Sequence, residues 1–179
     1  MNRLSEDCQL IIKHILKRTD EYNMHQKNYN QISVTINRIQ KILYLSQVED
    51  IKHTGKTMFE EDFYALPLGP EVIEVRNFYM DYCTGRIDTL KFPNGTITQD
   101  KKQIVDIILE CTNEMDNVTL SKNVCKMDNI WINTYRSQED NNKLISKTQL
   151  ISYYKPNNKP KTKKRTRRNT RYYKQNTIK

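Results

Sequence analysis

The stretch SVTINRIQKILYLSQVEDIKHTG, from Ser33 to Gly55, decides the fold. Ser33 can cap a helix, and apolar residues then recur at helical spacing up to Ile51. The broad apolar stripe comprises Ile36, Ile39, Ile42, Leu43, Leu45, Val48 and Ile51. Gly55 supplies a residue at which such a helix can end. The pattern therefore predicts a long amphipathic helix, the clearest one in the chain.

Helical spacing also predicts elements on both sides of this segment. An opening helix runs from Leu4 to Leu16, and the polar residues from Thr19 to Gln31 are expected to form a connector. Towards the C-terminus, a helix begins at Thr98 or Asp100. A last helix follows Ser146, which opens the capping-box pattern Ser-Lys-Thr-Gln.

A further helix is predicted to begin at Gly69-Pro70. Proline is favoured at the first helical position because the amide it lacks would have no partner there. Glu71 and Glu74 would then occupy the first turn, where the helix dipole favours negative charge.

Two segments allow a small amount of β-structure. Phe63 to Leu68 is too short for a helix and can be extended, and Asn94-Gly95 is typical of a tight turn between the arms Ile87–Lys91 and Thr96–Thr98. The expected fold is mainly α: a compact helical domain over residues 1–154 with a small β-hairpin.

Length and hydropathy place the chain in the class of soluble single-domain proteins. Its 179 residues fit one domain, and no run approaches the roughly 18 apolar residues of a membrane span. Residues 1–20 lack the features of a secretory signal. We expect a cytoplasmic protein with no membrane partner.

The net charge of +9 is unevenly distributed along the chain. Residues 155–179 hold eleven of the 30 Lys and Arg residues and no acid, so nineteen bases face all 21 acids in residues 1–154. The body is therefore slightly acidic. The basic tail, residues 155–179, is too polar to offset its ordering entropy and is expected to be disordered when free.

The basic tail has the composition of a nonspecific nucleic-acid-binding segment, since it combines phosphate-pairing cations with aromatic rings that can stack on bases. A solubilising role or an acidic protein partner fits the same composition. The candidate nucleic-acid-binding residues are Lys161, Lys163, Lys164, Arg165, Arg167, Arg168, Arg171, Tyr172 and Tyr173.

Catalytic and metal-binding patterns find no support in the sequence. Gly55-Lys56-Thr57 is not a phosphate-binding loop, because the glycine required five positions earlier is Asp50. The cysteines and histidines show no metal-ligand spacing, and no Gly-x-Ser-x-Gly motif is present. We expect neither an enzyme nor a bound metal or cofactor.

Four blocks in order resemble the Panacea domain, the SocA-like antitoxin family, over about residues 33–154. They are NRIQKILYLSQ from Asn37, TGKTMFEEDFYALPLGPEVIEVRNFY from Thr54, DNIWINTYR around Trp131, and LISKTQLISYY from Leu144. Where the family carries a tryptophan before Gly-Pro, this chain has Leu66, and the basic tail lies outside the family pattern.

The resemblance implies an α-rich, non-enzymatic antitoxin that neutralises a cognate protein toxin, either by direct contact or as an adaptor for proteolysis. The alternative is a phage or mobile-element accessory protein that binds nucleic acid through its tail. The sequence leaves a homo-oligomer open.

The stretch before Gly69-Pro70 is the candidate partner-binding surface. A rigid turn there would present apolar side chains in a fixed direction, and the preceding carboxylates are expected to lie exposed on a loop. The candidate residues are Glu60, Glu61, Asp62, Tyr64 and Leu66.

Overall fold

The computed structural model describes residues 4–27, 30–79, 92–137 and 143–156. Helices dominate these ranges, which confirms the mainly α prediction. The elements are α1 (Glu6–Met24), α2 (Ile36–Thr54), β1 (Phe63–Leu66), β2 (Gly69–Glu71), α3 (Ile73–Phe78), α4 (Gln99–Thr112), α5 (Asn117–Met127), α6 (Asn129–Arg136), β3 (Leu144–Ile145) and α7 (Lys147–Tyr154).

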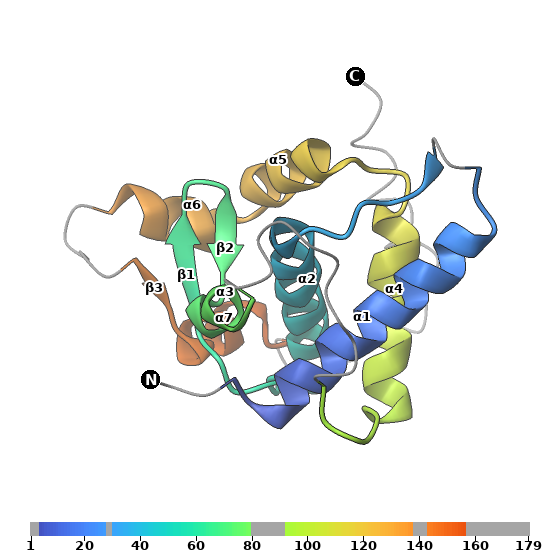
Figure 1. Cartoon of the computed structure of the whole chain (residues 1–179). Helices are drawn as coiled ribbons and strands as arrows, with labels where there is room; N and C mark the ends of the chain where they lie inside the picture. Colours follow the sequence, from blue (N-terminus) through green and yellow to red (C-terminus); the bar gives the residue numbers. More distant parts are fainter. Residues whose placement is uncertain (1–3, 28–29, 80–91, 138–142, 157–179) are drawn as a thin grey trace, which may run out of the picture.

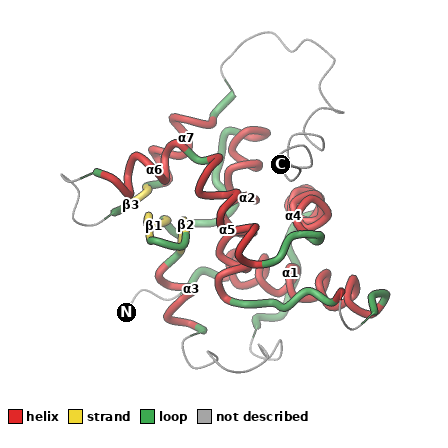
Figure 2. The backbone as a smooth tube through the Cα atoms, turned by 90° about the horizontal axis from the view of Figure 1, so that it is seen from above, coloured by secondary structure: helices red, strands yellow, loops and turns green. Residues whose placement is uncertain are grey.

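Helix α2 runs through the centre of the molecule. It packs against α1, α4, α5, α7 and β2. Figures 1 and 2 show α1 and α4 on one side of α2 and the sheet with α6 and α7 on the other. The apolar stripe of α2 thus joins a core to which helices and strands all contribute.

The ends of α2 follow from local sequence. Thr35 is the N-cap, and its side chain accepts a hydrogen bond from the amide of Arg38 at 3.2 Å, so the predicted cap at Ser33 is wrong by two residues. The predicted stop is confirmed, because Gly55 adopts a left-handed φ of 73° and its amide donates to Ile51.

Polar residues of α2 are buried together with its apolar stripe, and two glutamines hold neighbouring backbone segments. Gln40 accepts from the amide of Val72 at 2.8 Å and donates to the Val72 carbonyl at 2.9 Å. Gln47 accepts from the amide of Met58 at 2.7 Å and donates to the Phe59 carbonyl at 3.2 Å. Both glutamines are 0% exposed, so these bonds replace the water that the backbone lost.

Arg38 also binds neighbouring backbone, on the opposite side of α2. Its guanidinium donates to the carbonyl oxygens of Thr112 and Met115, both at 2.9 Å. These carbonyls lie at the C-terminal end of α4 and just beyond it, where a helix has no internal partners for them. Arg38 therefore satisfies the end of α4 from within α2.

The three strands form one antiparallel sheet in the order β2-β1-β3. In the hairpin, Tyr64 pairs with Glu71 and Leu66 with Gly69, so Pro67 and Leu68 make the turn. A small hairpin was predicted around Asn94-Gly95, but Thr96–Thr98 is not a strand. The other predicted arm, Ile87–Lys91, lies outside the described residues.

The prediction of a helix starting at Gly69-Pro70 is wrong. These residues belong to β2, and α3 begins only at Ile73. Proline has no amide hydrogen, which suits an edge strand as well as the first turn of a helix, and β2 is an edge strand. Glu74 alone of the two glutamates lies in the first turn of α3, whereas Glu71 is in the strand.

Helix α1 extends to Met24, so the expected connector from Thr19 is helical in its first part. Thr19 is tolerated there because it is buried and its hydroxyl donates to the Ile15 carbonyl at 2.9 Å. His14 and Arg18 bind one oxygen of Asp106 on α4, at 2.9 and 3.0 Å. The longer α1 thereby gains a polar link to α4.

The remaining predicted helix starts agree with the structure. Thr98 is the N-cap of α4, and Ser146 opens α7 in a capping box with Gln149. No helix within the described residues combines the length and the apolar character needed to cross a membrane. Of the tail predicted to be disordered, residues 155–179, Lys155 ends α7 as its C-cap, and residues 157–179 lie outside the described part of the chain.

We predict that Gln40→Met lowers the free energy of unfolding by about 2–5 kcal/mol, because the amide and carbonyl of Val72 would be left buried without partners. Urea unfolding of the full chain measures the loss. Gln103→Met, at an exposed position of α4, is the matched control and should stay within about 0.5 kcal/mol of the wild type. Equal effects of the two substitutions would show that the Gln40 bonds do not stabilise the fold.

Candidate partner-binding surface

The three carboxylates before β1 connect the sheet to α1 and α7. Glu60 is exposed and pairs with the Lys147 ammonium at 2.8 Å, while Asp62 accepts from the Lys147 amide at 2.8 Å. Glu61 accepts from the amide and hydroxyl of Ser5 at 2.5 and 2.9 Å.

These contacts correct the expectation that all three carboxylates are exposed. Glu61 is only 7% exposed, and its carboxylate binds the residue that caps α1. Asp62 is half-buried at the start of α7. Glu60 alone of the three is fully exposed.

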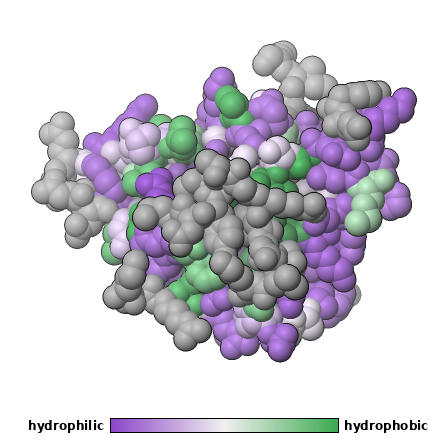
Figure 3. All heavy atoms as spheres, viewed as in Figure 1, coloured by the Kyte–Doolittle hydropathy of each residue, from purple (hydrophilic) through white to green (hydrophobic). Residues whose placement is uncertain are grey.

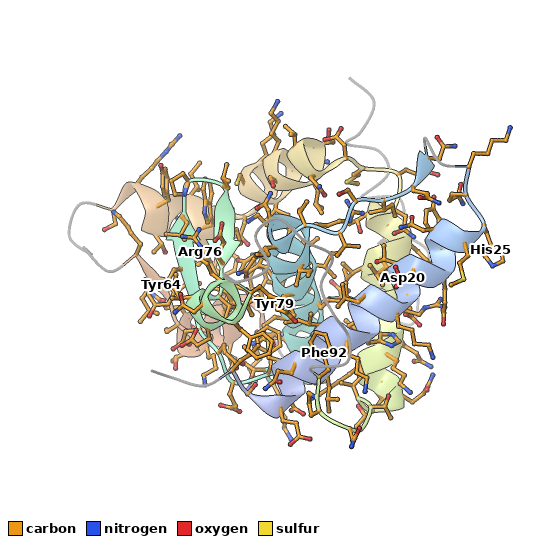
Figure 4. All side chains as sticks on the ribbon, in the orientation of Figure 1. Asp20, His25, Tyr64, Arg76, Tyr79 and Phe92 are labelled. Carbon is orange, nitrogen blue, oxygen red and sulfur yellow. The ribbon has the colours of Figure 1, made fainter. Side chains whose placement is uncertain are left out.

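Strand β1 divides its side chains between two faces. Phe63 and Ala65 are buried, and the Phe63 ring packs edge-on against Tyr44 of α2 with ring centroids 4.9 Å apart. Tyr64 and Leu66 alternate with them and are half-buried on the other face. Figure 4 shows Tyr64 on the side of the molecule that carries the sheet, across α2 from Asp20 and His25.

The hairpin turn exposes further apolar surface. Leu68 is 61% exposed, and Pro67 beside it is also exposed. Gly69 then adopts a φ of 112° directly above Lys41, and a side chain on Gly69 would place its Cβ 2.8 Å from Lys41 Cε. Glycine is required at this position, because other residues rarely adopt this φ and their Cβ would meet Lys41.

Helix α6 supports the hairpin from its side. The Trp131 indole nitrogen donates to the Leu66 carbonyl at 3.1 Å. Trp131 stacks on Tyr135 one turn later, with ring centroids 5.1 Å apart and ring planes 9° from parallel. Trp131 and Tyr135 were not among the predicted site residues, although the i, i+4 spacing of two aromatic residues indicated a common helix face.

A buried ion pair lies beneath the hairpin. Lys41 is 0% exposed, with its ammonium 3.7 Å from the Glu71 carboxylate and 3.5 Å from the Pro70 carbonyl. Arg76 binds the other carboxylate oxygen of Glu71 at 2.6 Å. Glu71 was predicted to be a charge at a helix start, but it is instead a buried carboxylate paired with the buried Lys41 and with Arg76, whose side chain is 50% exposed.

Burial dominates the electrostatics of Lys41. Removal from water lowers the pKa of its ammonium from 10.5 to about 8, although Glu71 favours the charged form. The nearby thiol of Cys125 is also affected, because burial raises its pKa above 9.0. Lys41 thus destabilises the folded state while it carries a charge.

Asp128 links the helices α2, α6 and α7 through hydrogen bonds. Its side chain accepts hydrogen bonds from the hydroxyls of Tyr44 on α2 and Tyr154 on α7, and from the Trp131 amide at 2.6 Å. Burial raises the pKa of both phenols, and the Asp128 carboxylate raises it further. Asp128 therefore fixes α6, and with it Trp131, relative to α2 and α7.

Few side chains in the described ranges are candidates for a metal site or a nucleic-acid site. No group of three or more His, Cys, Asp or Glu side chains there could hold a metal ion. Every predicted nucleic-acid-binding residue, from Lys161 to Tyr173, lies outside the described residues. The described residues thus bring the hairpin and α6 together through Trp131, with Glu60 exposed before β1.

Comparison with known families gives one finding. A family model described as an antitoxin SocA-like, Panacea domain matches residues 39–137, more than half of the chain. This range contains most of α2, the hairpin, α6 and the residues between them. No curated protein and no solved structure matches the chain.

We predict that the stability of the protein increases between about pH 8 and pH 10 relative to a Lys41→Met variant. In this range the folded protein has lost the Lys41 proton while the unfolded chain still binds it, so rising pH favours the folded state. The relative gain should reach roughly 2 kcal/mol.

Urea unfolding at several pH values measures this difference, with the exposed Lys126→Met as the matched control. The control should follow the wild type at every pH. A constant difference between wild type and Lys41→Met from pH 7 to pH 10 would mean that Lys41 titrates in the folded state as it does in water.

Proposed function

Because the chain belongs to the SocA-like Panacea domain family, we propose that it is the antitoxin of a toxin-antitoxin pair and acts by binding a cognate protein toxin. The observation that carries the proposal is the match over residues 39–137, which spans the central helix and the hairpin. Fold and family together support a binding protein in preference to an enzyme.

The hairpin is the proposed contact region for the toxin. Of the predicted residues, Glu60 is exposed and Asp62, Tyr64 and Leu66 are half-buried, and all four precede the turn at Gly69. Asp62 is already bound to the Lys147 amide. A surface held in one direction loses little conformational entropy on binding. We propose that Tyr64 and Leu66 contribute apolar contacts, while Glu61 and Asp62 support the loop from within.

Two mechanisms are compatible with such contacts. The bound antitoxin covers the active surface of the toxin, or it delivers the toxin to a protease. The rigid hairpin favours the first, because direct occlusion needs no element other than the body described here.

We predict that co-expression with the toxin encoded by the neighbouring gene restores growth, and that Tyr64→Ala combined with Leu66→Ala reduces this rescue. Apolar interface residues of this kind typically contribute about 1–4 kcal/mol each to binding. Colony counts under toxin induction measure rescue, and a thermal melt checks that the variant folds.

Met24→Ala is the control, since Met24 is 80% exposed at the far end of α1. Full rescue by a folded double variant would place the toxin contact elsewhere on the molecule. Absence of rescue by the wild-type protein would contradict the antitoxin proposal itself.

The charge of the basic tail favours a second, additional function in nonspecific nucleic-acid binding. Residues 157–179 retain ten of the eleven cations and both tyrosines, Tyr172 and Tyr173. Such a segment binds phosphates without reading bases, because it has no fixed geometry towards base edges. We propose that any nucleic-acid contact of this protein is made by the tail.

We predict that removal of residues 157–179 leaves the melting temperature unchanged and abolishes binding to generic duplex DNA. The full chain should bind DNA with an affinity that falls by about 10³–10⁵-fold between 50 and 200 mM salt, if six to ten phosphates are neutralised. Fluorescence anisotropy measures both. Salt-resistant binding, or binding that survives the truncation, would assign the contact to the body.

A further inference from the structure

An apolar surface with a basic border surrounds the hairpin turn. We call it the turn surface and define it by Leu66, Pro67 and Leu68 of the hairpin, Tyr135 of α6, and the bordering cations Lys122 and Lys126 of α5. Figure 3 shows apolar residues interrupting the hydrophilic surface over the hairpin and the neighbouring helices. Exposed apolar clusters of this kind mark interaction sites more often than they occur without a partner.

Three contacts show that the parts of the turn surface are neighbours. Trp131 joins Leu66 to Tyr135 through one hydrogen bond and one ring stack. On the other side, α5 packs against β2, and a Cβ on Gly69 would lie 3.4 Å from Cys125 Sγ. Lys122 shares a face of α5 with Cys125, because residues three apart are neighbours on a helix.

The charges of α5 and α6 have a single sign. Lys122, Lys126 and Arg136 are the charged residues of these two helices, and all three are exposed. The apolar centre is therefore bordered by the cations of α5, and the one charged residue of α6 has the same sign. A partner that fits would present apolar side chains flanked by acidic ones, since complementary charge steers association and fixes orientation.

We propose that the turn surface binds a short acidic segment of the partner protein, with apolar side chains at the centre of that segment. The inference rests on the proposed function in taking the partner to be a protein toxin. It adds the chemistry of the contacting segment, and it adds Leu68, Tyr135 and the α5 lysines to the contact.

Charge also favours an acidic segment over two other possible occupants of the turn surface, the basic tail and a second copy of the protein. The basic tail carries the same sign as the border of the turn surface and would be repelled. A second copy would bring identical cations together, because a two-fold contact places the same surface on both sides. An acidic segment is attracted at every point of the border.

The test uses a random 12-residue peptide library displayed on phage and selected on the full chain. Free synthetic peptide of residues 157–179 is added in excess, so that phage binding only the basic tail are removed. We expect the selected peptides to carry apolar residues flanked by Asp or Glu. Their affinities are then measured on purified variants.

Leu68→Glu should weaken binding of the selected peptides at least tenfold, and Lys122→Glu with Lys126→Glu should weaken it and reduce its salt dependence. Leu68→Ser is a second, uncharged variant, and circular dichroism confirms that each variant is folded. Met24→Glu, at an exposed apolar residue that ends α1, should stay within twofold of the wild type.

Peptides without acidic bias, equal binding to Leu68→Glu and Met24→Glu, or no selected peptide at all would overturn the inference. Displacement of the peptides by duplex DNA from a chain lacking residues 157–179 would show a nucleic-acid surface and would also overturn it. Dimerisation that Leu68→Glu abolishes would identify a second copy as the occupant.

The growth assay separates this inference from the antitoxin proposal. Rescue by wild type and equally by Leu68→Glu would leave the antitoxin function standing and refute the turn surface as the contact. Failure of the wild type to rescue would refute the function, whereas the peptide measurements would still decide the chemistry of the surface.

Discussion

Helix α2 is buried on nearly all sides, and the arrangement of the chain around it depends on the hydrogen bonds that its polar side chains make. A central helix of apolar residues alone would pack, but it would not select the positions of its neighbours. Gln40 binds the backbone of Val72, directly after β2, and Gln47 binds the segment before β1, while Arg38 binds the carbonyls that end α4. An unpaired buried polar group costs about 1–3 kcal/mol, so each of these side chains favours one arrangement of the surrounding chain.

The sequence revealed the elements whose signals are local. The apolar stripe of α2, the glycine stop at Gly55 and the capping box at Ser146 depend on residues within a few positions of each other, and the structure has all three. The hairpin was misplaced because Gly69-Pro70 fits two local structures equally well. The strand is accompanied by pairing with β1 and by the long-range bond between Gln40 and Val72, 32 residues apart.

The candidate site shows the same limit. Tyr64 and Leu66 were proposed because they precede a turn, and the structure leaves both half-buried on β1. Glu61 was expected to be exposed, since nothing in its local sequence shows that Ser5 binds it. Tyr135 was missed because its position beside Leu66 depends on Trp131. Likewise, Glu71 could be recognised as a buried partner of Lys41 only once β2 was placed over α2.

The contacts of α7 determine which bonds a pulling force on the C-terminal side of this helix would break first. Tyr154 is the last residue of α7, and it is bound to Asp128, which is bound in turn to Tyr44 in the central helix. A protease that pulls on the C-terminal end of the chain would apply its force to α7 first. That force must break the Tyr154–Asp128 bond and extract the buried Leu150 before it reaches α2. A partner held at the hairpin would stay bound through this first step only if α6 kept its place, because Asp128 also anchors the start of α6. Loss of α7 would thus remove one of the bonds that hold Asp128 at the start of α6 before the core unfolds.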